Sequence, residues 1–347
     1  MFPYWILVAY FAGGALLSDT ARRSEPRVST FLVIGGIIIA LMVGLRYEVG
    51  ADWTTYKLLF SYAAYAEFGR MLSIGDPAYQ LLTWTVRRIG VEIWLVNLVC
   101  GTIFAWGLMR FAQVQPNPWL AVLVAVPYLV TVVAMGYTRQ ATAIGILMAG
   151  LAAVQRGATT FRFAFYVLAA ALFHKTAVVI LPLVVFSSEK NRLVNMLAGV
   201  LVIYMFYSSF LADSVDKFVE SYIDTEYSSQ GATVRVVMNL LPAAAFFLYQ
   251  RRLGFGTIER RIWFFHSLAA FVLLVLLLVL PSSTAVDRLA LYVMPLQIAV
   301  LSRFPLAFGR RMGTFIVVLY SLAIEFVWLN FATHARYWIP YQVYPLF

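Results

Sequence analysis

Charged residues are scarce in this sequence: 12% of its 347 residues are Asp, Glu, Lys or Arg, whereas 62% are hydrophobic. A soluble globular domain usually carries about 25% charged residues, so this composition excludes an ordinary soluble fold. Apolar stretches recur from end to end, on the scale needed to cross about 30 Å of hydrocarbon. The composition therefore predicts an all-α fold, a polytopic transmembrane helix bundle, that forms a single integral membrane domain over residues 1–347.

Cysteine is nearly absent, and so are the familiar motifs of soluble enzymes. Cys100 is the only cysteine, which excludes a disulfide within the chain and a cysteine-based metal site. The sequence contains no Gly-rich phosphate loop, no HExxH and no GxSxG motif. No acidic cluster at metal-ligand spacing lies in an apolar stretch. We therefore expect neither a metal nor a cofactor.

The hydrophobic runs predict about twelve membrane elements. In chain order they cover residues 3–18, 28–45, 91–109, 118–135, 139–155, 161–174, 176–187, 193–211, 233–249, 262–281, 286–303 and 312–331. Residues 161–187 are predicted to form a broken pair of short helices, which is tolerated beside a water-filled cavity. Apolar residues at helical spacing also predict interfacial amphipathic helices at 52–89, interrupted at Asp76-Pro77.

The net charge of +10 is explained by membrane orientation rather than by nucleic-acid binding. Most Lys and Arg residues lie in short loops on one side of the predicted bundle, as the positive-inside rule requires. The inner residues are Arg22, Arg23, Arg27, Arg110, Arg156, Arg162, Lys190, Arg192, Arg251, Arg252, Arg260, Arg261, Arg303, Arg310 and Arg311. This orientation places both termini and the segments 46–90 and 212–232 on the extracytoplasmic side. We interpret the acidic run 213–231 as a solvated loop.

A second group of charges lies within or beside apolar runs at the outer level, where a charge at membrane depth costs at least ~2.5–3.5 kcal/mol. The charged members are Arg46, Asp52, Arg139, His174, Lys175, Arg235, Asp287 and Arg288, and they are accompanied by Tyr56, Gln140 and Tyr292. Arginines bind phosphate in a bidentate manner, and fixed cations stabilise a leaving pyrophosphate without a metal. Histidine is the side chain whose unperturbed pKa lies near neutrality, so His174 is a candidate general base.

These residues also have structural interpretations. An arginine at a helix end often extends to the lipid headgroups. His174 could hydrogen-bond a backbone carbonyl, and Asp287 could form only an ion pair with Arg288. Glu325, in the last element, belongs to neither group of charges, and we expect it to pair with an arginine across the bundle.

Taken in order, these residues give the chain a resemblance to the EpsG family of bacterial polysaccharide polymerases, which are related in role to the Wzy O-antigen polymerases. The matching pieces are short and cover most of the chain: Arg46 with Gly50-Ala51-Asp52 and Tyr56, Thr138-Arg139-Gln140-Ala141, Phe173-His174-Lys175-Thr176-Ala177, Arg288 with Tyr292, and Tyr337-Trp338-Ile339-Pro340-Tyr341. The chain departs from the family in two places. An expected asparagine is missing before Arg139, and the run 213–231 matches nothing in the family.

The resemblance implies a glycosyltransferase of the bacterial inner (plasma) membrane, which transfers a glycan from one undecaprenyl-pyrophosphate carrier to a lipid-linked repeat unit. It implies that His174 or Asp52 is catalytic, that Arg139, Arg288, Arg46 and Lys175 bind pyrophosphate, and that Gln140, Tyr56, Arg235, Asp287 and Tyr292 contact substrate. The implied partners are lipid-linked oligosaccharides, membrane lipid, a chain-length regulator and export machinery. The sugar and its linkage are left open.

Other functions remain open from the sequence. A flippase for lipid-linked oligosaccharides also needs a cationic cavity, but one that is reached from both sides of the membrane. A glycosyltransferase that uses a polyprenyl monophosphate sugar needs an acidic base in its first outer loop, which Asp52 supplies. A proton-coupled transporter needs a membrane-embedded carboxylate, for which only Glu325 qualifies.

Overall fold

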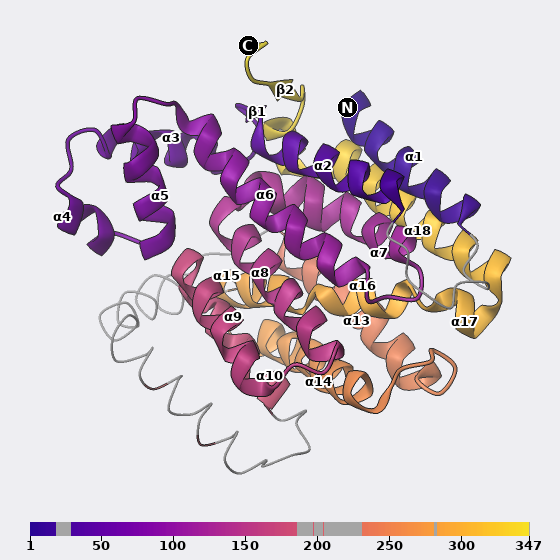
Figure 1. Cartoon of the computed structure of the whole chain (residues 1–347). Coiled ribbons are helices and arrows are strands. Elements are labelled where there is room, and N and C mark those ends of the chain that lie inside the picture. Colours follow the sequence, from indigo (N-terminus) through magenta and orange to yellow (C-terminus); the bar gives the residue numbers. More distant parts are fainter. Residues whose placement is uncertain (19–28, 186–196, 198–203, 205–230, 281–282, 347) are drawn as a thin grey trace.

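The computed structural model describes residues 1–18, 29–185, 197, 204, 231–280 and 283–346, and these are almost entirely helical (Figure 1). The predicted all-α class is therefore confirmed. In chain order the α-helices are α1 (Phe2–Leu17), α2 (Thr30–Gly44), α3 (Trp53–Tyr62), α4 (Phe68–Ser73), α5 (Pro77–Arg88), α6 (Ile93–Ala112), α7 (Pro118–Ala125), α8 (Thr138–Gln155), α9 (Thr160–Phe173), α10 (Leu181–Val185), α13 (Ala232–Tyr249), α14 (Thr257–Val279), α15 (Thr284–Val293), α16 (Pro295–Leu301), α17 (Phe304–Phe308) and α18 (Arg310–Phe331). A π-helix, η1 (Val126–Ala134), continues α7, and the 3₁₀ helices η2 (Lys175–Ile180) and η5 (Thr333–Tyr337) follow α9 and α18.

The expectation of about twelve membrane elements is not confirmed. Among the described residues, α6, α13, α14 and α18 are long and apolar enough to cross a membrane, and the bent pair of α15 with α16–α17 adds a fifth candidate. The other apolar helices are shorter. Helix α1, for example, has 16 residues and rises about 24 Å, less than the ~30 Å of a bilayer core. The predicted element 193–211 lies outside the described residues except for 197 and 204, as does the acidic run up to residue 230.

Helix α8 packs between α6 and α9 and carries arginines at both ends. A Cβ atom on Gly107 of α6 or on Gly145 of α8 would collide with the backbone of the opposite helix. Small residues at such crossings allow membrane helices to approach closely. Arg139 lies in the first turn of α8 and Arg156 is its C-cap residue, so the glycine crossing also fixes where these two charges lie.

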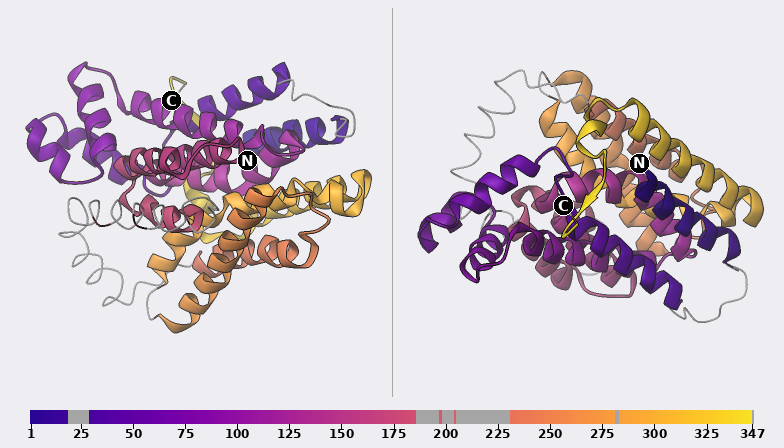
Figure 2. Two further views of the ribbon diagram at one scale, coloured as in Figure 1. Left: turned by 60° about the horizontal axis from the view of Figure 1, so that its bottom comes forward. Right: turned by 90° about the horizontal axis from the view of Figure 1, so that it is seen from above.

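Helices α3, α4 and α5 form a lobe beside the main bundle (Figure 2). The sequence predicted two amphipathic helices here, whereas the six-residue α4 was missed because it is too short to show a periodic pattern. The inward residues Trp53, Tyr56 and Phe60 are buried as the spacing predicted. Helix α5 begins at Pro77, which confirms the predicted interruption.

The break between α9 and η2 also agrees with the prediction for residues 161–187. Helix α9 ends at Phe173, and His174 takes an extended conformation with φ −156° and ψ 111°. The 3₁₀ helix η2 then begins at Lys175. This break turns the side chain of His174 and the backbone of Lys175 towards the lobe.

The segment after α18 folds back onto the beginning of the chain. Strand β2 (Gln342–Val343) pairs antiparallel with β1 (Arg46–Tyr47). Trp338 is buried and its Nε1 donates to the carbonyl of Thr131 in η1 at 2.7 Å. The carbonyl of Tyr337 accepts from the Gly50 N–H at 2.9 Å. These contacts fix the loop between β1 and α3, which carries Asp52.

Candidate active site

Asp76 is the hub of a polar cluster that joins three parts of the chain. It is the N-cap residue of α5 and is only 4% exposed. Its Oδ2 accepts a hydrogen bond from Arg139 Nη1 at 2.9 Å, and its Oδ1 accepts from the Lys175 backbone N–H at 3.1 Å. His174 Nδ1 lies 3.9 Å from Oδ1, slightly beyond hydrogen-bond distance. Burial raises the pKa of the Asp76 carboxyl, and Arg139 opposes that shift.

The Arg139 guanidinium is positioned by aromatic rings as well as by the ion pair. Its Cζ atom lies 5.9 Å from the ring centroid of Tyr56 and 6.0 Å from that of Tyr79, within the range of cation–π attraction. The Arg139 side chain remains 34% exposed. It is therefore held in a defined orientation and can still be reached by a ligand.

Arg235 and Asp287 form a buried ion pair between α13 and α15. The sequence had suggested Arg288 as the partner of Asp287, and the structure shows Arg235 in that place. Arg235 also donates to the hydroxyls of Tyr128 and Tyr137, at 2.6 Å and 2.9 Å. Breaking a buried pair from one side typically costs about 3–5 kcal/mol. This ion pair therefore holds α13 against α15. Arg235 affects the site through the action of its charge on the Asp52 carboxyl.

Asp52 lies in the field of three guanidinium groups. Burial raises the pKa of its carboxyl, and the charges of Arg288, Arg139 and Arg235 lower it in that order. Within the part of the chain that the structure describes, the Asp52 side chain makes no hydrogen bond. Arginines from α8, α13 and α15 thus converge on one carboxyl at the start of α3.

Arg288, Gln140 and Tyr292 contact one another's helices and the break that carries His174. Arg288 Cζ is 4.5 Å from the ring centroid of Tyr137, and its carbonyl accepts from Gln140 Nε2 at 2.7 Å. The hydroxyl of Tyr292 is 3.1 Å from Thr176 Oγ1. The ring of Tyr292 lies 6.4 Å from that of His174, between centroids. The structure therefore brings ten of the eleven predicted site residues to one region, namely Asp52, Tyr56, Arg139, Gln140, His174, Lys175, Arg235, Asp287, Arg288 and Tyr292.

Arg46 is buried beside this site and donates its hydrogen bonds within the protein. Its side chain is 1% exposed, and all of its described hydrogen bonds are made to protein acceptors. They join the carbonyls of Val43 and Val49, the hydroxyl of Thr138 at 2.6 Å and the side-chain oxygen of Asn97 at 3.5 Å. Arg46 therefore ties the end of α2 to α6 and α8, and its assignment to pyrophosphate stays a prediction.

Sequence reasoning missed Asp76 and the aromatic residues of the site. Asp76-Pro77 was interpreted only as a helix break, although an acidic N-cap beside a predicted cationic site was a usable signal. The contacts of Tyr79 and Tyr137 with arginines had no signal, because they depend on tertiary packing. Glu325 was expected to pair with an arginine. It is fully buried instead, and its closest described partner is the Thr131 hydroxyl at 3.5 Å.

Comparisons with known proteins identify a family. No curated protein sequence and no solved structure matches the chain significantly. Within the described residues, no group of three or more His, Cys, Asp or Glu side chains is placed to hold a metal ion. A family model described as the EpsG family matches residues 29–343, a range that contains every residue of the site. This match and the apolar helices together indicate a membrane protein. The chain belongs to the EpsG family, a family of polysaccharide polymerases.

Proposed function

We propose that this protein transfers a glycan from one undecaprenyl-pyrophosphate carrier to a lipid-linked repeat unit, on the extracytoplasmic side of the bacterial inner membrane. The observation that supports this most is the gathering of three guanidinium groups. Arg235 and Arg288 lie 5.1 Å and 4.5 Å from the ring centroid of Tyr137, two residues before Arg139, and all three charges act on the Asp52 carboxyl. Fixed positive charge of this kind suits a phosphate-rich leaving group. Family membership supports polymerisation, and the charges support a pyrophosphate carrier.

Arg139 and Arg288 hold the donor pyrophosphate in this mechanism. Each guanidinium contacts tyrosine rings: Arg139 contacts Tyr56 and Tyr79, and Arg288 contacts Tyr137. Because these contacts already restrict the arginine side chains, less conformational entropy is lost when a ligand binds. As the bond between the sugar and the pyrophosphate breaks, these cations stabilise the charge on the leaving oxygens. We therefore assign no metal to the reaction.

His174 removes the proton from the acceptor hydroxyl while the acceptor oxygen attacks the anomeric carbon. The proton passes to the imidazole, and the electron pair of the breaking bond leaves with the pyrophosphate. Asp76 lies 3.9 Å from His174 Nδ1, so a small movement of the ring would allow it to stabilise the imidazolium, as the acid does in a hydrolase triad. Asp52 is the second candidate base, because burial raises its pKa and it has no hydrogen bond in the described chain.

The test is a reconstituted assay. Purified protein in lipid vesicles is mixed with undecaprenyl-pyrophosphate-linked repeat units and EDTA, without nucleotide sugar, and products are separated on a gel. The expected result is a glycan ladder that disappears in Arg139→Ala. A ladder that requires added Mg²⁺ would overturn the metal-free mechanism. A ladder made only from monophosphate-linked sugars would overturn the carrier. If no ladder forms and the lipid substrate crosses the bilayer in a leaflet-accessibility assay, the protein is a flippase.

A further inference from the structure

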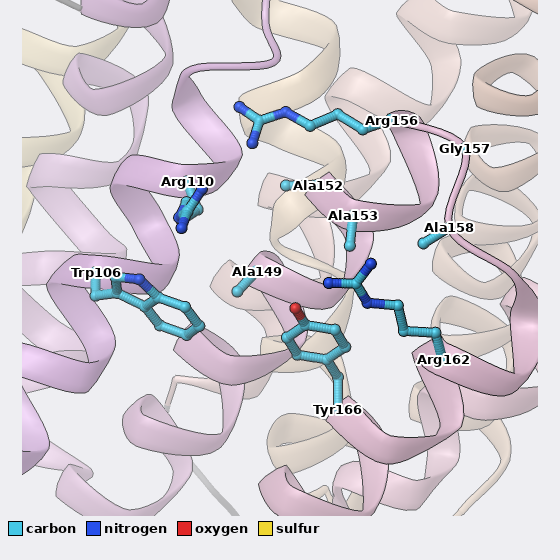
Figure 3. A pocket seen from close by; sticks show the side chains of 10 residues that line it. All are labelled: Trp106, Arg110, Ala149, Ala152, Ala153, Arg156, Gly157, Ala158, Arg162 and Tyr166. Carbon is cyan, nitrogen blue, oxygen red and sulfur yellow. The ribbon is translucent and has the colours of Figure 1, made fainter.

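A second group of arginines surrounds a pocket at the other end of α8 (Figure 3). The pocket has a volume of about 290 Å³ and is lined by Arg110 of α6, Arg156 at the C-cap of α8 and Arg162 in the first turn of α9. Trp106 and Tyr166 form its aromatic walls, and alanines of α8 lie between them. We refer to this feature as the arginine pocket.

None of the three guanidinium groups has a counter-charge within the described part of the chain. No acidic residue among the described ones lines the pocket, and no hydrogen bond or ion pair joins the side chains of Arg110, Arg156 or Arg162 to another described residue. By contrast, Arg139, Arg235 and Arg303 each pair with a carboxylate. Like charges that share one pocket repel one another, and an anion would relieve that repulsion.

The shape and surroundings of the pocket indicate what kind of anion it takes. Arginine forks match the oxygens of a phosphate, and about 290 Å³ is at the small end of ligand pockets, which suits a headgroup better than a whole lipid or an oligosaccharide. Phe161 and Phe165 flank Arg162 on α9 and are 67% and 57% exposed. This apolar surface beside the arginines offers a place for acyl chains.

We propose that the arginine pocket binds the phosphate headgroup of an anionic membrane lipid. Basic pockets between membrane helices commonly take such headgroups. The positive-inside rule assigns all three arginines to the inner side, so the lipid would come from the inner leaflet, away from the proposed polymerase site. The competing explanation is that these arginines only set membrane orientation and attract anionic lipid without a defined site.

The experiment compares lipid retention by native mass spectrometry. Purified full-length protein is incubated with phosphatidylglycerol or with zwitterionic phosphatidylcholine, and bound lipid is counted. The variant Arg110→Gln/Arg156→Gln/Arg162→Gln is matched by Arg251→Gln/Arg252→Gln/Arg311→Gln, which removes the same charge from three exposed arginines elsewhere on the predicted inner side. We expect wild type and the matched control to retain phosphatidylglycerol. The pocket variant should bind it at least about tenfold more weakly, because it loses charge-assisted hydrogen bonds.

Three results would overturn the proposal. Equal loss in both triple variants would mean diffuse attraction to the membrane surface, and unchanged retention in the pocket variant would mean that the pocket is not the site. A measurement with inorganic phosphate distinguishes a lipid headgroup from a free anion. Thermal stabilisation of the protein by phosphate alone, with no lipid adduct, would assign the pocket to a soluble anion. If the triple variant fails to fold, Arg162→Gln alone is measured, and it must still reduce retention.

Discussion

The two ends of α8 present arginines in different ways. At its first turn, Arg139 pairs with an acid and contacts tyrosine rings, and the neighbouring Arg235 and Arg288, from other helices, are held by an ion pair and by a ring. Around its last turn, the three arginines of the pocket are exposed and have no such partners in the described chain. The first arrangement fixes the direction of each charge before substrate arrives, which catalysis requires. The second leaves the charges to be neutralised by whatever binds.

Helix α8 itself offers no polar path between its two ends. Residues Gln140 to Ala152 of α8 are buried, and apart from Gln140 and Thr142 they are apolar or glycine. The glycine crossing of α6 with α8 closes this region further. We therefore expect the two arginine groups to bind separate ligands, and we expect that each group can be altered without the other.

The largest effect should come from the proposed base. His174→Ala is expected to lower the polymerisation rate by about 10²–10⁴-fold, the usual contribution of general base catalysis, while the protein remains folded by size-exclusion chromatography. His334→Ala is the control, because His334 is exposed in η5. If His174→Ala polymerises at the wild-type rate and Asp52→Asn does not, the base is Asp52.

Arginine-to-lysine changes at the two ends of α8 test directly whether the two arginine groups act independently. Arg139→Lys should reduce the rate of ladder formation by about 10²–10³-fold, because lysine keeps the charge but cannot form a bidentate contact. Arg156→Lys should leave polymerisation unchanged. Equal loss of activity in the two variants would show that the ends of α8 are coupled, which the packing does not predict.

A smaller effect is expected from Asp76, which positions other residues. Asp76→Asn should lower kcat about 10–100-fold, because misplacement of Arg139 by an ångström or less is enough to have this effect. Asp76→Glu should recover part of the activity, since it restores the ion pair. Glu67→Gln, an exposed change on the same lobe, should have no effect. Failure of glutamate to recover any activity, despite normal folding, would contradict a positioning role.

The smallest effect concerns stability and pH. Burial raises the pKa of Asp52 above its unfolded value, so the protonated form is favoured in the fold. Its contribution to stability is therefore present at acidic pH and is lost as the pH rises through the folded pKa. Between pH 4 and pH 7, the Tm of wild type should fall relative to that of Asp52→Asn. The variant that lacks the arginines of the pocket should follow wild type, because no carboxylate of the described chain lines the pocket.

The sequence predicted this fold well where patterns are local. The breaks at Asp76-Pro77 and at His174 were correct, because proline and an interrupted apolar run act on the adjacent backbone. The count of about twelve membrane elements is not confirmed, for a physical reason. Apolar composition reveals helices that avoid water, but such a helix can be shorter than the bilayer core, as α1 is.

The site was predicted in composition and only partly in its pairings. An outer charge within an apolar run is costly wherever it points, so Arg139 and Arg235 could be selected without a structure. Whether such a charge faces a ligand or an internal acceptor depends on helix rotation, and this is why the sequence did not reveal the internal acceptors of Arg46. The hub at Asp76 was missed for the same reason, since its partners come from α8 and η2.

The contact between Gly50 and Tyr337 has a consequence for the order in which the molecule is made. The loop that carries Asp52 is translated early, yet a hydrogen bond to Tyr337 and the pairing of β1 with β2 hold it in place. Those partners are added to the growing chain only after the helices from α1 to α18 have been synthesised. The nascent chain thus lacks a positioned Asp52 until residues 337–343 have been made, long after the loop that carries it.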